Sequence, residues 1–505
     1  MVCDPWHIVG HAALFEGVRC VVIGPVGHTL YDGQRMASLR TILSLPEAIG
    51  LSLAVISPTV TAAFNITLVV QATGPAAPLA FAIGTVAMAL IALSFMAFTH
   101  RVAHAGSAYA YIAHTFGRRM GFVAGWTMLL TYFGFGTGFA ALVGSFSSAA
   151  FQQALGLDYA SLWLMIGGGA LVVAWWLAYR DMRLAGRLML WLEGAAVVGI
   201  LGLCVGILRQ VHPNTAQTVA TFRPATSFGG WSGMGFGMVF SILCFAGFEG
   251  AATLGEETVR PRRNIPIALF TTVIGSGVFF VFVGYCEVIG FGTSGVKQLA
   301  LSQAPLNDLA LRFASPRVAV ALDLAAAISC FSGVLGCLAA AGRILFALGR
   351  VGLSPPLARV HSVHGTPAAA VSTATIVMIL PFALWGPFVG AANFYSYTST
   401  IAVLALILVY VAVGSAEVVE ASRERRPLWP AVCVLGPILL LWVLYRNLYP
   451  VPDFPNNLWP YVALTWTLAA WAIMRVRPNI SSAPLPTGFM AIHAASVPAQ
   501  TPAES

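Results

Sequence analysis

Charge is scarce in this sequence. Its 505 residues include 18 acidic and 26 basic side chains, so 9% of the chain is charged. A water-soluble domain carries about 25% charged residues. Hydrophobic residues make up 58% of the chain. Most of such a chain must be solvated by lipid, which excludes a soluble enzyme, a nucleic-acid-binding protein and a disordered scaffold.

Residues that often carry chemistry are also few. Lys297 is the only lysine, so the chain has no Gly-Lys-Ser/Thr phosphate loop and cannot drive transport with ATP by itself. The eight cysteines include no Cys-x-x-Cys pair, and we interpret them as free thiols. The ten histidines lie mostly in the expected tails and loops. We therefore expect no enzyme activity, no cofactor and no metal site.

Long apolar runs dominate the sequence. A membrane-spanning helix needs about 20 mainly apolar residues. Twelve runs meet this length, near residues 47–71, 75–99, 121–151, 160–179, 188–208, 233–256, 265–291, 318–342, 367–389, 391–414, 428–448 and 458–474. The sequence predicts an all-α integral membrane protein with about twelve transmembrane helices.

The basic residues fall mostly on one side of the predicted membrane. With twelve spans, 20 of the 26 lie in segments on the side of both termini, and 6 lie on the other side. Cytoplasmic loops retain basic residues. We therefore expect a multi-pass plasma membrane protein with both termini in the cytoplasm. This bias accounts for the net charge of +8 without a nucleic-acid partner.

Two of the predicted spans contain residues that interrupt a helix. The first contains Ser57-Pro58-Thr59, and proline lacks an amide donor and clashes with the preceding turn. The sixth contains two glycines and an acid between Phe245 and Gly250. Alone, each is also compatible with a proline kink or with glycine-mediated packing. Because these spans run in opposite directions, the pair favours an inverted repeat of five spans plus five.

This repeat divides the chain into five parts. We expect a cytoplasmic N-terminal tail over 1–46, the two five-helix repeats over 47–208 and 209–414, two extra helices over 415–477, and a disordered cytoplasmic tail over 478–505.

Helices that break at mid-membrane expose backbone groups suited to a zwitterion. The amide end of a half-helix attracts a carboxylate, and the carbonyl end attracts an ammonium group. We therefore expect the two breaks to bind a zwitterion. The candidate binding residues are Ser57, Thr59, Thr61 and Ala62 in the first span and Phe245, Ala246, Gly247 and Phe248 in the sixth.

Three segments resemble signatures of the amino acid/polyamine/organocation transporter superfamily. The sixth-span signature is matched from Phe245 to Thr258 and then from Arg260 to Pro266. The loop between the second and third spans is matched from Ala105 to Tyr111, with Gly117 and Gly125-Trp126. The end of the eighth span and the loop after it are matched from Arg343 to Pro355 and from Gly365 to Pro367. The resemblance implies an inverted-repeat fold, alternating access and transport of amino acids or related amines.

Two positions depart from the family pattern. Val351 stands where the family usually has the aspartate of an Arg-Asp-Gly motif, so any salt bridge made by that acid is absent at the cytoplasmic gate. Pro58 lies in the first-span break, where relatives have a Gly-Ser-Gly-like segment. Proline removes one amide donor, which puts the exact carboxylate ligands in question.

Ionisable groups inside spans are functional candidates because burying them is costly. Glu249 lies at the sixth-span break, where the resemblance implies gating or proton movement; capping of free amides is the alternative. Glu193 in the fifth span lies near the position where some relatives place a lysine. It is a candidate for coupling, or for pairing with Arg187.

The remaining candidates lie in the seventh and eighth spans. Ser329 and Ser332 are near the place where relatives can hold sodium, although helical serines more often bond to their own backbone. We expect proton coupling rather than sodium coupling, with exchange as a further alternative. Near the outer ends of these spans lie Glu287 and Asp323, which are expected to pair with Lys297, Arg312 or Arg317.

The sequence thus predicts a secondary transporter of amino acids that works by alternating access. The alternatives are a carrier of polyamines or organic amines, an amino acid exchanger, and a nutrient sensor that binds its ligand without moving it. No feature of the sequence indicates an oligomeric state.

Overall fold

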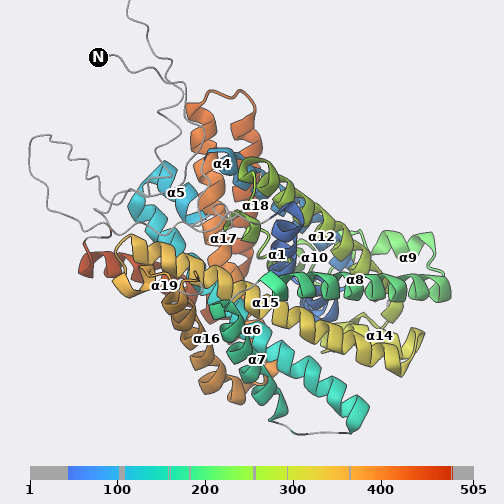
Figure 1. Ribbon diagram of the computed structural model, residues 1–505. Coiled ribbons are helices and arrows are strands. Elements are labelled where there is room, and N and C mark those ends of the chain that lie inside the picture. Colours follow the sequence, from blue (N-terminus) through green and yellow to red (C-terminus); the bar gives the residue numbers. More distant parts are fainter. Residues whose placement is uncertain are drawn as a thin grey trace, which may run out of the picture. The chain divides into compact units, whose positions relative to one another are not determined.

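The computed structural model describes residues 44–101, 108–156, 161–180, 183–253, 258–292, 294–362 and 365–478, together with residues 159 and 480. These residues belong to one compact unit, Leu39–Ser505. They form helices joined by short connections, and no β-strand occurs among them (Figure 1). The two predicted tails lie largely outside this part of the chain.

Ten of the predicted spans are single continuous helices. They are α4 (Ala77–Arg101), α6 (Arg118–Leu155), α7 (Leu162–Arg180), α8 (Arg183–Val211), α12 (Pro261–Phe291), α15 (Pro316–Arg350), α16 (Ala368–Val389), α17 (Ala391–Arg423), α18 (Trp429–Leu448) and α19 (Trp459–Val476). Within the described residues, nine segments are long and apolar enough to cross a membrane. One of these segments, Pro58–Thr99, contains most of the first span as well as the second. Together with α19 and the interrupted sixth span, the segments account for the predicted spans, so the prediction of an all-helical membrane protein with about twelve spans is confirmed.

The first and sixth spans are interrupted, as the sequence predicts. The first consists of α1 (Leu45–Ile56), the short helix α2 (Pro58–Val60), the π-helical segment η1 (Thr61–Asn65) and α3 (Ile66–Thr73). The sixth consists of α10 (Gly230–Leu243) and α11 (Gly250–Thr253), with turns between them.

Local sequence explains where several helices begin and end. Proline occupies one of the first two positions of α12, α15, α18 and α19, where its missing amide has no helical partner to lose. Gly292 follows α12 with a φ of 77°, a left-handed conformation that favours glycine. Helices α6 and α17 extend beyond the predicted runs because polar residues continue the helix past the apolar stretch.

Helix packing supports the inverted repeat. The second span packs on the seventh (α4 on α12), the third on the eighth (α6 on α15), and the fourth on the ninth (α7 on α16). Each pair joins helices that occupy equivalent places in the two repeats. A contact within one repeat also recurs in the other: the first span packs on the fifth (α1 on α8), and the sixth packs on the tenth (α10 on α17). This is the pattern that a two-fold relation between the repeats produces.

Short helices fill the connections. They are α5 (Ala108–Phe116), α9 (Thr215–Ala220), α13 (Val296–Leu301), α14 (Pro305–Phe313) and the single turns η2 (Gly74–Ala76), η3 (Pro224–Thr226), η4 (Pro355–Ala358) and η5 (Asn456–Leu458). Helix α14 packs on α8, α12, α15 and η1, so it contacts the middle part of the interrupted first span.

The last helix is fastened to the third span by two tryptophans. Trp126 Nε1 donates to the Trp466 carbonyl at 3.0 Å, and Trp466 Nε1 donates to the Trp126 carbonyl at 2.8 Å. The rings stack with centroids 5.0 Å apart. Beside them, Thr127 Oγ1 donates to Thr467 Oγ1 at 3.1 Å. The last helix, α19, is therefore attached to α6 by directional polar contacts as well as by apolar packing.

Candidate functional site

The first-span break is centred on Ser57. This residue has a φ of 49° and a ψ of 70°, a left-handed conformation that is costly for a residue other than glycine. Its hydroxyl donates to the Ser329 carbonyl of α15 at 3.3 Å, which fixes the break against the eighth span. Pro58 begins α2 at a position where no amide is needed. The predicted binding residues Thr59, Thr61 and Ala62 follow and are all buried.

Glu193 caps the half-helix that begins after this break. The Thr59 amide donates to Glu193 Oε1 at 2.9 Å, across 134 residues of sequence. The Ser329 hydroxyl also lies beside this carboxyl group. Glu193 is buried, with 6% of its surface exposed. A protonatable group from α8 thus occupies the first free amide after Pro58, and that amide is not available to a ligand in this conformation.

The sixth-span break is held by Glu249. Gly247 has a φ of 102°, which L-residues with side chains rarely adopt. Its amide donates to Glu249 Oε2 at 3.1 Å. Tyr132 from α6 donates its hydroxyl to Glu249 Oε1 at 2.8 Å, and Tyr410 from α17 donates to Oε2 at 2.6 Å. One fully buried carboxyl group therefore joins spans 3, 6 and 10, a set that we call the Glu249 clamp (Tyr132, Gly247, Glu249 and Tyr410).

Aromatic rings surround the Glu249 clamp. The Phe248 ring packs on Phe95 at 5.3 Å and on Tyr410 at 5.4 Å between centroids. Phe95 also meets Tyr410 edge to face at 5.8 Å. Phe248 therefore points into the bundle interior next to the clamp, and Phe245 packs on Phe280 of α12 at 5.2 Å. Neither ring lines the cavity described below.

Ser52 joins the two interrupted spans. Its hydroxyl donates to the Phe248 carbonyl at 3.0 Å and accepts from the Ala251 amide at 2.9 Å. Both partners are backbone groups freed by the sixth-span break, and Ser52 lies on α1. One fully buried side chain thus satisfies two backbone groups that no helix can satisfy.

Replacing Ser52 with alanine is expected to lower thermal stability and to reduce transport at least about tenfold. The variant leaves the Phe248 carbonyl and the Ala251 amide without their partner, and each unsatisfied buried group costs about 1–3 kcal/mol. The control is Ser94→Ala on α4, because the Ser94 hydroxyl is equally buried and has no hydrogen-bond partner in the part of the chain that the structure describes. Equal melting temperatures for the two purified variants would contradict this role of Ser52.

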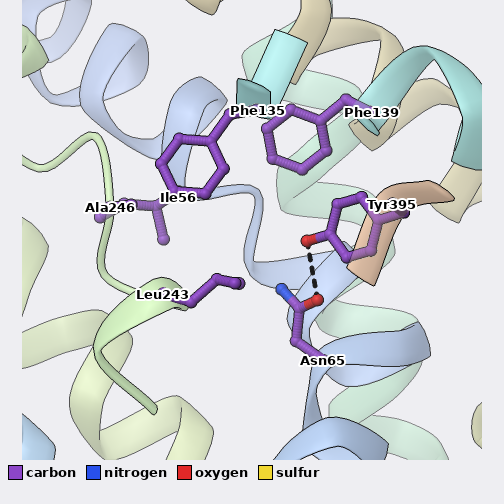
Figure 2. Close-up of a pocket in the computed structure, with 7 residues that line it drawn as sticks. All are labelled: Ile56, Asn65, Phe135, Phe139, Leu243, Ala246 and Tyr395. Carbon is purple, nitrogen blue, oxygen red and sulfur yellow. Dashed lines mark hydrogen bonds between the residues drawn. The ribbon is translucent and has the colours of Figure 1, made fainter. Parts of the chain in front are cut away.

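A narrow cavity lies between the two breaks (Figure 2). Its lining comes from Ile56, Asn65, Phe135, Phe139, Leu243, Ala246 and Tyr395. The Tyr395 hydroxyl donates to Asn65 Oδ1 at 2.8 Å. These two side chains face one another on one side of the cavity, and the rings of Phe135 and Phe139 lie above them in the view of Figure 2. Residues from spans 1, 3, 6 and 10 therefore converge at the level of the breaks.

The cavity joins some of the predicted site residues and leaves others apart. Ala246 lines it, and Ile56 precedes the predicted Ser57. Gly247 and Glu249 belong to the clamp next to it. Ser329 contacts Ser57 and Glu193, whereas Ser332, one turn further along α15, is buried without lining the cavity.

Several residues of the site are missing from the sequence prediction. Ser52, Asn65 and Tyr395 are not among the predicted site residues, and Tyr132 is not recognised as a partner of Glu249. A polar residue inside an apolar span is the signal that could identify Ser52 and Asn65, because such residues need partners. No comparable signal marks Tyr395, since aromatic residues are frequent throughout the spans.

Two buried acids differ from the prediction. Asp323 forms no ion pair within the described ranges; it accepts from Asn307 Nδ2 at 2.6 Å. Neither oxygen of Glu287 has a hydrogen-bond partner among the described residues. The predicted pairing fails because Lys297 and Arg312 lie on the loop helices α13 and α14 with exposed side chains, and Arg317 is exposed in the first turn of α15.

The chain is similar in sequence to known transporters. Residues 43–469 match the family model described as amino acid permease. The branched-chain amino acid permease BcaP of Lactococcus lactis is 28% identical over 74% of this chain and 83% of its own. The low-affinity putrescine importer PlaP of Escherichia coli is 26% identical over 70% and 77%.

One further relative and a solved structure also match this chain. The methylthioribose transporter of Bacillus subtilis is 25% identical over 80% of this chain and 86% of its own. The crystal structure of a manganese transporter mutant from Eremococcus coleocola superposes with a TM-score of 0.54 at 10% identity. It covers 89% of this chain and 99% of the other chain, and this likeness concerns the fold alone.

Proposed function

Since the chain belongs to the amino acid permease family, we propose that it carries amino acids with apolar side chains across the plasma membrane by alternating access. The single observation behind this proposal is the cavity between the two interrupted spans, which residues of spans 1, 3, 6 and 10 line at the level of the breaks. The relatives named as amino acid and putrescine transporters agree with a small-molecule substrate.

The lining of the cavity favours an apolar substrate side chain. Five of the seven lining residues, Ile56, Phe135, Phe139, Leu243 and Ala246, present only carbon atoms in their side chains. The other two, Asn65 and Tyr395, already bond to one another. A diamine needs an anionic or carbonyl partner at each end. No acid lines this cavity in the described chain, which favours an apolar amino acid over a polyamine.

Glu193 supports proton coupling. Its carboxyl group bridges spans 1 and 5 and lies beside Ser329 of span 8, so a change in its charge acts on three helices at once. We propose that a proton on Glu193 stabilises the closed arrangement of these helices. Sodium held by the same carboxylate with Ser329 and Ser332 is the competing proposal. Both termini are taken to lie in the cytoplasm, which places α13 and α14 outside.

Uptake into proteoliposomes tests the substrate and the coupling together. Purified protein is assayed with labelled leucine, lysine, glutamate and putrescine, with and without an inward proton gradient and with sodium present or absent. We expect concentrative leucine uptake that needs the proton gradient and is abolished by a protonophore. Uptake of putrescine alone would contradict the apolar substrate, and a sodium requirement would contradict proton coupling. Saturable binding without any uptake would favour a sensor.

A further inference from the structure

A buried acid outside the site described above is left without a protein partner. Glu287 lies on α12 with 1% of its surface exposed, and neither of its carboxyl oxygens has a hydrogen-bond partner in the described chain. An ionised carboxylate buried without a partner costs many kcal/mol, and the group takes up a proton instead. Its burial therefore favours a neutral Glu287 carboxyl group in this conformation.

The other ionisable groups around α12 do not compensate a charge on Glu287. The Cys204 thiol of α8 is near the carboxyl group and contacts Cys286. Glu47 of α1 caps its own helix, and Glu193 of α8 accepts from Thr59. On the outer side, Asp308 accepts from Ser302, Arg312 stacks on the Phe291 ring at 4.9 Å, and Lys297 and Arg209 are exposed.

The remaining charged residues of these helices lie at the other end of the bundle. They are His100 and Arg101 at the end of α4, Arg183 and Arg187 at the start of α8, and Arg262 and Arg263 at the start of α12. Gly277 and Gly284 of α12 pack on Thr85 and Phe81 of α4, so the two helices are antiparallel and the end of α4 lies far from Glu287.

Glu287 lies just beneath a seam between three helices. A Cβ atom at Gly290, three residues further along α12, would lie 2.7 Å from Leu309 of α14 and 3.3 Å from Ile207 of α8. Helix α14 also packs on η1, the part of the first span that contains Asn65. Movement of α14 away from α12 would therefore open the substrate cavity and the surroundings of Glu287 on the same side.

We propose that Glu287 is a proton-binding site that must be occupied before the outer half of the bundle can close. In the outward-open state its carboxylate exchanges protons with outside water. A carboxylate that has lost its proton cannot be buried beside Cys204 without a partner, so closure waits for the proton. This site is separate from Glu193 and Glu249, and the inference rests on the proposed alternating-access transport with α14 outside.

Exchange of labelled for unlabelled substrate tests this site, because exchange needs closure but no net proton gradient. It is measured at equal pH on both sides, from about pH 5 to about pH 9, for the wild type and for Glu287→Gln. Glutamine is permanently neutral, so we expect the wild type and the variant to exchange substrate at equal rates at about pH 5. Above the pH at which the wild-type rate begins to fall, the variant should be faster than the wild type by about tenfold for each pH unit. The control Asp323→Asn, another buried acid near the outer ends, should keep the wild-type profile.

Each outcome decides the proposal. Parallel profiles for the wild type and Glu287→Gln, or a wild type that does not slow at alkaline pH, would overturn it and would leave the transport function standing. Absence of exchange with every substrate would overturn the proposed function instead. In that case infrared spectra of the purified protein decide about Glu287: a protonated-carboxyl band at neutral pH that is lost in Glu287→Gln supports the site, and an unchanged spectrum overturns it.

Discussion

The variant Glu193→Gln is expected to lose concentrative uptake while it still exchanges substrate. Glutamine keeps an oxygen that can accept from the Thr59 amide, so the 2.9 Å contact that caps the half-helix is preserved. It cannot bind or release a proton. If the proton on Glu193 drives closure, its removal separates substrate movement from proton movement without destroying the binding cavity.

The size of this effect follows from the energy of a proton gradient. A gradient of one pH unit supplies about 1.4 kcal/mol per proton. A carrier that moves one proton with each substrate molecule therefore accumulates the substrate about tenfold at zero membrane potential. We expect this ratio for the wild type and a ratio of about one for Glu193→Gln. The measurement is the internal-to-external substrate ratio in proteoliposomes with a clamped potential.

A matched acid controls for the loss of a carboxyl group in general. Glu420 lies on α17 and pairs with Arg423 at 2.8 Å, away from both breaks. Glu420→Gln should accumulate substrate as the wild type does. Undiminished accumulation by Glu193→Gln would exclude Glu193 as the coupling group and would assign the coupling to another protonatable group.

Replacing Glu249 with leucine is expected to abolish transport and to destabilise the protein severely. The Tyr132 and Tyr410 hydroxyls and the Gly247 amide would lose their common acceptor, and each buried unsatisfied group costs about 1–3 kcal/mol. Glu249→Gln keeps an acceptor oxygen, so it should fold and transport more slowly. Uptake by the reconstituted variants measures the loss of transport, and thermal melting of the purified variants measures the loss of stability.

The tyrosines of the Glu249 clamp allow the same contacts to be removed one at a time. Tyr132→Phe and Tyr410→Phe each delete one hydrogen bond to a carboxyl group, which is worth about 1.5–3 kcal/mol if that group is ionised. We expect at least about tenfold slower uptake for each. Tyr111→Phe is the control, because Tyr111 is equally buried and its hydroxyl lies 3.3 Å from Thr99 Oγ1. Thr99 also donates to the Phe95 carbonyl, so its hydroxyl keeps a hydrogen bond when the Tyr111 hydroxyl is removed. Normal uptake by both clamp variants would refute a role of the clamp in gating.

The sequence was sufficient to predict features that depend on local chemistry. Apolar length alone identified the spans, and Pro58 and the glycines around Phe248 located the two breaks, because the effect of proline and glycine on a helix acts within a few residues. The family resemblance agreed with the permease match. The outline of the fold and the level of the cavity were therefore predictable.

Partner choice across the bundle was not predictable. Ser52 joins groups 196 and 199 residues away, and Tyr395 reaches Asn65 across 330 residues. Such contacts depend on how each helix is rotated about its own axis, and a uniformly apolar span gives no amphipathic pattern to reveal that rotation. The same uncertainty explains the mistaken ion pairs of Glu287 and Asp323, since nearness in sequence to a basic residue did not imply contact.

The shortness of the interrupted helices has a consequence for biosynthesis. Helix α1 has 12 residues and α10 has 14, so at about 1.5 Å per residue neither can cross a hydrocarbon layer about 30 Å thick. Each must enter the membrane as part of a longer apolar stretch. Ser52 can join the two breaks only after the sixth span has been synthesised, nearly 200 residues later. During translation the first span therefore lies in the membrane without its contacts to the sixth span. The substrate site is assembled only when the second repeat has been inserted.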